Sequence, residues 1–367
     1  MRRERPGRRR SSRRIAPMSS RRSAFAVVAL AAALLAGPRA GNEARAQAQA
    51  PGPTLAAVKA RDVLSCGAHP GAPGFGLMDS QSVYRGLDAD TCRAVAAAVL
   101  GDPGKIRWVV LTSQARLPAL QSGQVDLLAR TTTWTQSRDT ANGLNFAATN
   151  FYDGQGFLVR RASNVRRARE LEGATVCVTS GTTNELNLAD WARAQGVRIQ
   201  PLVFDQNDET RLAYIAGRCD AFSTDASQLA GIRGALQRPD DHVVLPDIIS
   251  KEPLAPAVRH GDDQWLDIVK WTFFALVEAE ELGVTQANAE QMLSSPNPAI
   301  RRLLGLSGDH GPLMGLDRRW AYNAIRAVGN YGEIFERNLG EGSPIKLPRG
   351  LNDLWTRGGL MYAPPIR

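Results

Sequence analysis

The sequence predicts an α/β protein built as two lobes that are joined by a pair of extended crossovers. Strand-like and helix-like segments alternate from Val58 onward, and a second round of this alternation begins at Ala174. Residues 154–159 and 248–256 have the extended pattern expected of crossovers between the rounds. Alternating strands and helices favour parallel sheets with crossover helices. Two strands that connect two such lobes form a hinge.

The first round contains three strand-like and two helix-like segments. Ala89, Cys92, Val95 and Val99 fall on one face of a helix that follows the turn at Arg85-Gly86. The other elements predicted here are strands at residues 62–67, 106–110 and 125–129, and a helix at 114–122 that ends before Gly123.

The second round repeats this order and opens on a helix signal. Thr182 and Glu185 have the spacing of a capping box, which predicts that a helix begins there. The other predicted elements of this round are strands at residues 175–179, 199–204 and 220–223 and a helix at 208–216. After the second crossover, helices are predicted at residues 265–281, 288–304 and 318–337, followed by an end rich in proline and glycine.

The net charge of +9 is concentrated at the start of the chain. Residues 1–46 hold twelve arginines and two glutamates, so the remainder is near −1. A basic leader forms no folded basic face, and we therefore expect no nucleic-acid partner. The length of 367 residues suits two or more lobes, and the hydrophobic content of 43% is ordinary for a globular chain.

Residues 1–48 have the parts of a secretory signal peptide. Arg21 and Arg22 precede an apolar stretch at residues 24–37, and small residues follow it. The apolar stretch is too short to span a membrane comfortably, and no later stretch qualifies. The mature protein is therefore expected to be exported and soluble.

Some details of export stay open at this point. Cleavage is expected at Ala44-Arg45-Ala46 or at Ala46-Gln47-Ala48, and Met18 is an alternative start to Met1. The arginine pair is compatible with Sec or with Tat export.

Export places the cysteines in an oxidising compartment. The four cysteines allow three pairings, and their spacing does not choose among them. No zinc pattern is present, and the chain has only four histidines, so we expect neither a metal nor a cofactor. The cysteines are Cys66, Cys92, Cys177 and Cys219.

A threonine-rich loop is the strongest functional signal. Thr131-Thr132-Thr133-Trp134-Thr135 follows the strand predicted at residues 125–129, and Arg138 comes five residues after Thr133. Open α/β sheets bind ligands at the carboxyl ends of their strands. A fixed guanidinium beside hydroxyl and N–H donors suits a carboxylate, because its planar fork can bond both oxygens.

Several motifs together resemble one family of exported receptors. The chain is similar to the periplasmic solute-binding proteins of family 3, which serve ABC importers of polar amino acids, and within them to the general L-amino-acid-binding branch. The motifs, in family order and spacing, are Tyr84-Arg85-Gly86-Leu87-Asp88-Ala89-Asp90, Thr131 to Arg138, Asn145-Phe146-Ala147, Tyr152-Asp153-Gly154-Gln155-Gly156-Phe157, Ser180-Gly181-Thr182-Thr183, and Gly217-Arg218-Cys219-Asp220 with Asp225.

This resemblance implies a two-lobed periplasmic binding protein fold of type II, in the form of a Venus flytrap. It implies a periplasmic receptor that captures L-amino acids such as glutamate, glutamine, aspartate and asparagine and delivers them to an ABC permease in the inner membrane. A monomer is expected.

The resemblance also implies a set of ligand contacts. The ligand α-carboxylate is expected at Arg138, Thr133 and Thr183, where a helix N-terminus favours an anion. The α-ammonium is expected at Asp225, with help from Thr131. Phe75 lies in a stretch that fits the aromatic lip of the family, and Trp134 lies in the ligand loop. The side-chain readers expected from these loops are Arg130, Trp134, Phe75 and His69.

The expected fold gives boundaries for the two lobes and a pairing for the four cysteines. Residues 53–157 are expected to form the first part of lobe 1, 158–250 lobe 2, 251–304 the return to lobe 1, and 305–367 a C-terminal extension packed on the lobes. Pairing within each lobe, Cys66 with Cys92 and Cys177 with Cys219, would leave the hinge free to move, whereas a bridge between lobes would lock it.

Two other function classes remain as alternatives. An exported enzyme on this scaffold, such as a dehydratase or a peptidoglycan lyase, needs a positioned acid or base. The sequence has no Ser-His-Asp order, no HExxH and no paired catalytic carboxylates. A sensor domain would need a transmembrane helix and a signalling domain, which are not found in this sequence.

Two of the candidate site residues also have ordinary structural explanations. Considered singly, Arg138 could form a surface ion pair, and Asp225 could cap the helix that follows it.

Overall fold

The computed structural model describes residues 52–367. The predicted signal peptide and both expected cleavage sites lie outside these residues. Within the described range, no helix combines the length and the apolar character that crossing a membrane requires.

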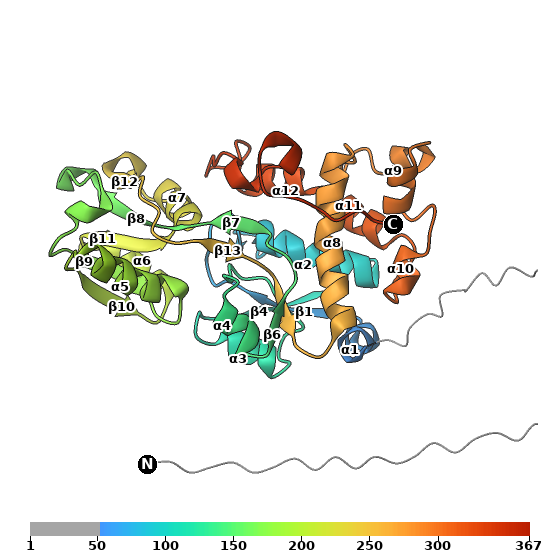
Figure 1. The fold of residues 1–367 in the computed structure, drawn as a ribbon, viewed down its shortest axis with the longest axis horizontal. Helices are drawn as coiled ribbons and strands as arrows, with labels where there is room; N and C mark the ends of the chain where they lie inside the picture. The colour runs from blue at the N-terminus through green and yellow to red at the C-terminus, as the bar shows by residue number, and fades with distance from the viewer. Residues whose placement is uncertain (1–51) are drawn as a thin grey trace, which may run out of the picture. The chain divides into compact units, whose positions relative to one another are not determined.

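Lobe 1 is built on a five-stranded sheet (Figure 1). In spatial order its strands are β4 (Ile106–Val110), β1 (Leu64–Ala68), β5 (Leu127–Leu128), β14 (Ala257–Arg259) and β6 (Leu144–Phe146). β1 pairs in parallel with β4 and β5, whereas β14 runs antiparallel to β5 and β6. Because β14 comes late in the chain, the polypeptide returns to this sheet after it has built lobe 2.

Lobe 2 repeats the plan with a second five-stranded sheet. Its strands, in spatial order, are β10 (Gln200–Phe204), β9 (Thr175–Thr179), β11 (Ala221–Asp225), β8 (Gln155–Arg160) and β12 (His242–Val244). β9 pairs in parallel with β10 and β11, and β8 runs antiparallel to β11 and β12. The predicted α/β class with two parallel-rich sheets is confirmed.

Two short strands connect the lobes. β7 (Phe151–Asp153) carries the chain toward lobe 2, and β13 (Glu252–Leu254) brings it back. They pair with each other in antiparallel fashion, and Glu252 lies opposite Asp153 (Figure 1). The predicted hinge of two strands is confirmed, but its first strand precedes the crossover predicted at residues 154–159, because residues 155–160 form β8 and pair within the lobe 2 sheet.

The helices cover the sheets and follow most of the predicted segments. α5 begins directly after Thr182, whose hydroxyl accepts the Glu185 N–H at 3.2 Å, as the capping signal predicts. The helices are α1 (Pro53–Arg61), α2 (Leu87–Leu100), α3 (Arg116–Gln121), α4 (Gln136–Thr140), α5 (Thr183–Gln195), α6 (Asn207–Ile215), α7 (Ala226–Gly234), α8 (Asp263–Glu281), α9 (Pro298–Leu303), α10 (His310–Leu313), α11 (Trp320–Val328) and α12 (Tyr331–Asn338).

The helix predicted at residues 288–304 is wrong in extent. The structure has a short 3₁₀ helix at Gln291–Ser294 and then α9. Pro296 and Pro298 separate them, because proline lacks the N–H that a continuous helix needs. Pro298 stands instead at the first position of α9, where that N–H would have no partner.

The helix predicted at residues 318–337 is likewise divided in two. Gly329 ends α11 with a φ of 78°, and Asn330 accepts the Glu333 N–H at 2.9 Å to start α12. α11 packs against α2 and α8, so the C-terminal segment shares the hydrophobic core of lobe 1.

Both disulfides lie within single lobes. Cys66 of β1 is bonded to Cys92 of α2, and Cys177 of β9 is bonded to Cys219 just before β11, with Cα–Cα distances of 6.4 and 5.7 Å. The predicted pairing is confirmed. Each bond fastens elements of one lobe and leaves the hinge strands unconstrained.

We expect the double variant Cys177→Ala/Cys219→Ala to lose about 2–4 kcal/mol of unfolding free energy, because the bond no longer restricts the unfolded chain. Equilibrium denaturation in urea measures this loss. Peptide mapping of the unreduced wild-type protein provides the control for connectivity. A fragment that links Cys66 or Cys92 to Cys177 or Cys219 would show that the assignment is wrong.

Candidate functional site

Loops at the ends of six strands enclose a polar cavity between the lobes. The contributing strands are β1, β4 and β5 of lobe 1 and β9, β10 and β11 of lobe 2, all at their carboxyl ends, where such sheets bind ligands. The cavity has a volume of about 20 Å³ and is lined by His69, Ser113, Arg116, Arg130, Thr131, Thr133, Thr182, Thr183, Asn184, Asn207, Thr224, Asp225 and Gln228.

The two lobes touch around this cavity. Gln114 Nε2 of lobe 1 donates to Ser180 Oγ of lobe 2 at 2.8 Å. The hydroxyls of Thr133 and Thr183, one from each lobe, are 3.3 Å apart. The arrangement is therefore a closed cleft, and the residues predicted on separate lobes meet within it.

The threonine loop is held from beneath by Asp88. Thr131 has a φ of 39°, a left-handed conformation that is rare for threonine, and its N–H donates to Asp88 Oδ2 at 2.7 Å. Asn150 donates to the other oxygen at 3.3 Å. Burial raises the pKa of Asp88 to about 6, although these hydrogen bonds oppose the shift. The aspartate of the α2 motif thus fixes the loop that carries Thr131 and Thr133.

Arg138 lies on α4, directly behind the threonine loop. Its Nη1 donates to the Thr133 carbonyl at 2.9 Å, and the residue is 8% exposed. Burial lowers the pKa of Arg138, and the carboxylates of Glu252 and Asp225 oppose that shift. Arg138 therefore adds positive charge behind the cavity wall, in the part of the site shared with Thr133.

Two other arginines, unlike Arg138, line the cavity itself. Arg130 donates to the Leu111 carbonyl at 2.8 Å, and burial lowers the pKa of its guanidinium to about 9, so it stays charged at neutral pH. Arg116 Nη1 makes only long bonds, of 3.3 and 3.4 Å, to backbone carbonyls, and its buried Nε has no hydrogen-bond partner. A buried donor without a partner is costly, so Arg116 is a candidate for ligand contact.

Sequence reasoning named Arg130 but missed Arg116. The available signal was its position on α3, three and four residues before Ala119 and Leu120. These two residues are buried, so the same helix face turns Arg116 inward.

Asp225 ends β11 on the opposite wall, in lobe 2. Its oxygens accept Asn184 Nδ2 at 2.9 Å and Gln228 Nε2 at 3.0 Å, and it makes no side-chain capping bond to α7. Burial raises the pKa of Asp225 well above its usual range, and the carboxylates of Asp153 and Glu252 raise it further. The cap explanation for Asp225 therefore fails.

His69 lines the cavity as a neutral donor. Its Nδ1 accepts the Gly71 N–H at 2.9 Å, which leaves the proton on Nε2. Burial lowers the pKa of His69 well below 6.5, and the charges of Arg130 and Arg116 lower it further.

The structure does not bring Phe75 or Trp134 to the cavity wall. Phe75 is fully buried in the core of lobe 1, with its ring 5.1 Å from that of Phe151. Trp134 is 39% exposed and stacks on Phe146 at 5.7 Å. Thr131, Thr133, Thr183 and Asp225 do line the cavity.

Known proteins share this architecture. The family described as bacterial extracellular solute-binding proteins, family 3, matches residues 64–288. This chain belongs to that family. Among relatives of this solute-binding protein, the general L-amino acid-binding periplasmic protein AapJ of Rhizobium johnstonii is 54% identical over 316 residues, which cover 86% of this chain and 93% of the relative.

Two other comparisons extend the similarity. The glutamate/glutamine/aspartate/asparagine-binding protein BztA of Rhodobacter capsulatus is 52% identical over 348 residues, covering 95% of this chain and all of the relative. A solved ABC transporter periplasmic binding protein from Brucella ovis, with glutathione bound, has a TM-score of 0.84 and 51% identity and covers 87% of this chain and 100% of its own. The type II fold of this solute-binding protein is thereby confirmed.

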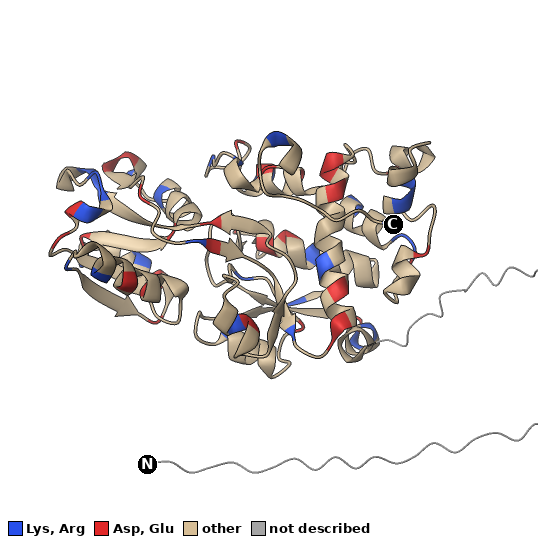
Figure 2. Cartoon of the chain, viewed as in Figure 1, with Lys and Arg blue, Asp and Glu red and all other residues tan. Residues whose placement is uncertain are grey.

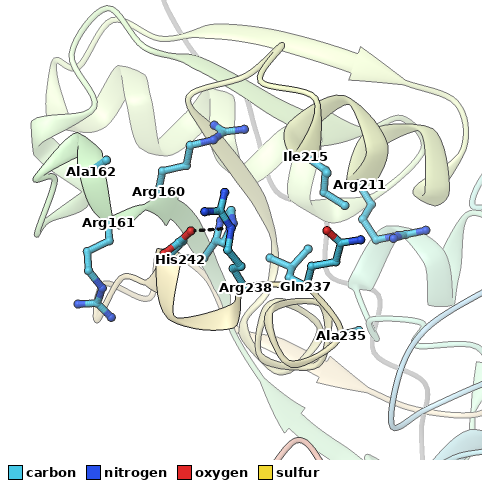
Figure 3. Close-up of a pocket in the computed structure, with 11 residues that line it drawn as sticks. Arg160, Arg161, Ala162, Arg211, Ile215, Ala235, Gln237, Arg238 and His242 are labelled. Carbon is cyan, nitrogen blue, oxygen red and sulfur yellow. Dashed lines mark ion pairs between the residues drawn. The ribbon is translucent and has the colours of Figure 1, made fainter.

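A larger cavity in lobe 2 lacks the properties of a binding site. It has a volume of about 890 Å³ and is lined by several arginines, but their guanidinium groups point in different directions (Figure 3). Arg238 is paired with Asp241 at 3.1 Å, and Arg160 donates to the Cys219 carbonyl. Basic and acidic residues are interspersed over both lobes (Figure 2). An anion site requires donors that converge, as they do in the cleft.

We expect Asp88 and Asp153 to contribute a fall in the unfolding free energy of the solute-binding protein as pH rises from about 4 to about 6, which buried His69 opposes because its pKa is lowered. Burial raises the pKa of Asp88 and of Asp153 to about 6 in the folded chain, from an ordinary value of 3.8. Between these values the folded chain holds protons that the unfolded chain has released, so raising the pH costs stability.

Equilibrium denaturation without added ligand, from pH 4 to pH 7, measures this dependence. Asp88→Asn should flatten it, whereas the same change at the exposed Asp190 should not. An identical pH dependence in the wild-type protein and in Asp88→Asn would contradict the assignment.

Proposed function

We propose that this protein is the solute-binding receptor of an ABC importer, which captures polar L-amino acids between its lobes and delivers them to a membrane permease. The cavity carries the proposal: its walls place buried arginines of lobe 1 opposite Asp225 of lobe 2. A zwitterionic amino acid has complementary charges at both ends of its shared backbone. Binding it therefore joins the two lobes, and capture and closure become one event.

We assign the α-carboxylate of the ligand to Arg138, Thr133 and Thr183. Thr133 and Thr183 face each other across the cleft, and Arg138 lies behind them. Thr183 is the first residue of α5, so the N–H groups of this turn have no partner within the helix. The positive end of the helix dipole favours an anion there.

We assign the α-ammonium to Asp225, near the Thr131 carbonyl. Each Asp225 oxygen accepts one amide N–H, which leaves acceptor capacity on both oxygens. The Thr131 carbonyl accepts only a long bond, of 3.3 Å, from Arg116. An ammonium group would satisfy these acceptors and neutralise the buried carboxylate.

The remaining wall of the cavity offers mainly donors. Arg116, Arg130, His69 and Ser113 gather around it, and each presents an N–H or O–H group. A carboxylate or amide oxygen on the ligand side chain matches them, which supports glutamate, glutamine, aspartate and asparagine as ligands. The name of the Rhodobacter capsulatus relative specifies these same amino acids. We assign no ligand contact to Phe75 or Trp134.

We infer a binding role without catalysis. The similar proteins are named as binding proteins. The buried carboxylates of the cleft have the raised pKa values that enzymes also use, and here they suit the capture of an ammonium group.

We further propose that the receptor acts in the periplasm as a monomer. The predicted leader supports export, and the two disulfides suit an oxidising compartment. We assign residues 53–154 and 251–304 to lobe 1, 155–250 to lobe 2 because β8 begins at Gln155, and 305–367 to an extension on the lobes.

A thermal-shift screen against the twenty amino acids should show the largest rises in melting temperature with acidic amino acids and their amides. Arg138→Ala should weaken all of these ligands alike, by about 2–4 kcal/mol, because the α-carboxylate loses a charge-assisted partner. Arg193→Ala, an exposed arginine on α5, is the matched control.

Asp225→Asn serves as the second arm of the same screen. It should weaken each amino acid more than the corresponding desamino acid, because only the amino acid carries the ammonium. Wild-type affinity in Arg138→Ala would remove that residue from the site. A screen with no rise for any amino acid would refute the proposed function.

Gly231→Leu should weaken ligand binding by about 1–3 kcal/mol without touching an anchor, because it obstructs closure. Gly231 lies on α7 of lobe 2, beside the C-terminal segment (Figure 1), and a Cβ there would lie 3.0 Å from Pro73 of lobe 1 and 3.3 Å from Ile345. Calorimetry measures the affinity, and small-angle scattering measures the fall in radius of gyration on saturation with glutamate.

The exposed Ala194→Leu on α5 adds a similar side chain away from the cleft and should bind as the wild type does. Unaltered affinity in Gly231→Leu would show that the lobes need not approach this closely. Identical scattering of the wild type with and without bound glutamate would rule out the hinged mechanism.

A further inference from the structure

Glu252 is a fully buried carboxylate in the hinge. It stands on β13, opposite Asp153 of β7, and has an exposed fraction of 0%. The ligand anchors assigned above do not include it. A buried charge of this kind is costly unless its surroundings satisfy it completely.

Four donors satisfy both Glu252 oxygens. Oε2 accepts the hydroxyls of Thr133 at 2.6 Å and Thr183 at 2.8 Å. Oε1 accepts Asn187 Nδ2 at 2.7 Å and the Ser250 hydroxyl at 2.6 Å. These bonds use the full acceptor capacity of a carboxylate.

The four donors come from three parts of the molecule. Thr133 belongs to lobe 1, Thr183 and Asn187 belong to α5 of lobe 2, and Ser250 belongs to the hinge segment. One carboxylate therefore binds both lobes at once. Separation of the lobes must break its bond to Thr133 or its bonds to α5, since the two sides move apart.

The bonds to Glu252 also determine which donor groups Thr133 and Thr183 offer to a ligand in the cavity. A threonine hydroxyl has one proton, and both Thr133 and Thr183 donate theirs to Glu252. Both residues line the cavity, so Glu252 takes their hydroxyl protons from behind, and their backbone N–H groups are the donors left for the ligand α-carboxylate. The positions of two anchor residues in the ligand site therefore depend on a residue of the hinge.

We propose that Glu252 is a positioning residue that couples hinge closure to ligand capture, by holding Thr133 and Thr183 together across the cleft. The proposal rests on the proposed function, because Thr133 and Thr183 are ligand anchors there. When the lobes meet, one carboxylate completes the contact between them and sets the geometry of the anchors. Loss of Glu252 weakens the closed complex, and the ligand leaves more readily.

The test compares the full mature protein with Glu252→Gln, which keeps the size of the side chain but replaces an acceptor oxygen with a donor. Loss of one or two charge-assisted hydrogen bonds predicts a roughly 10- to 100-fold rise in Kd for both L-glutamate and L-glutamine. The rise should be in the dissociation rate measured by stopped-flow fluorescence, because closure follows encounter. Glu209→Gln, the same change at an exposed position of α6, should bind as the wild type does.

A double-mutant cycle separates positioning from general destabilisation. Thr133→Val removes the hydroxyl and keeps the shape, so in the proposed arrangement it adds little to the loss caused by Glu252→Gln. Losses that multiply would show independent action and overturn the proposal. This cycle is read by affinity. If Glu252→Gln folds poorly, Thr133→Val and Thr183→Val form the cycle instead, because both hydroxyls act through the same Glu252 oxygen.

The remaining outcomes are distinguishable. Unchanged or tighter binding by Glu252→Gln, beside normal binding by the wild type, overturns the inference and leaves the proposed function intact. A Kd rise caused by slower association, with an unchanged dissociation rate, also overturns it. Absence of amino-acid binding by the wild type refutes the proposed function, and the inference falls with it.

Discussion

Compensation of buried charge is the constraint on which the cleft depends. Arg116, Arg130 and Arg138 come from lobe 1, and Asp225 comes from lobe 2, with Glu252 at the hinge between them. A buried ion costs several kcal/mol unless an opposite charge and hydrogen bonds surround it. Asp88 of lobe 1 lies near Arg130, but the other buried charges of opposite sign face each other across the cleft. The same contact that brings the lobes together assembles a surface that matches a zwitterion.

The two disulfides stiffen each lobe and leave the hinge between the lobes free to move. Each disulfide fastens a strand to an element of the same lobe, whereas the connection between the sheets consists of two short paired strands. Stiff lobes preserve the positions of the anchors, and the hinge strands allow the lobes to move. In the function proposed here, recognition rests on groups that every amino acid shares, and the donor-rich wall next to them supplies discrimination among side chains.

Local signals were enough to predict most of the fold. Alternating apolar residues indicated the strands, and the cap at Thr182 located the start of α5, because these features depend on neighbours within a few residues. The C-terminal helices were less predictable. Apolar periodicity continues across Gly329, but the chain turns there so that α11 and α12 can pack on the rest of lobe 1.

The sequence by itself determined which loops carry the site, because Arg138 and Asp225 follow strand ends in a motif order that a known family shares. Only the tertiary structure decided which side chains enter the cavity. Glu252 in an extended strand has the pattern typical of a solvated charge, and its burial depends on distant partners. Thr133, for example, is separated from Glu252 by 119 residues. Phe75 lies in the core of lobe 1, where the ring of Phe151 packs against it. Long-range packing sets such choices, and it leaves no local trace in the sequence.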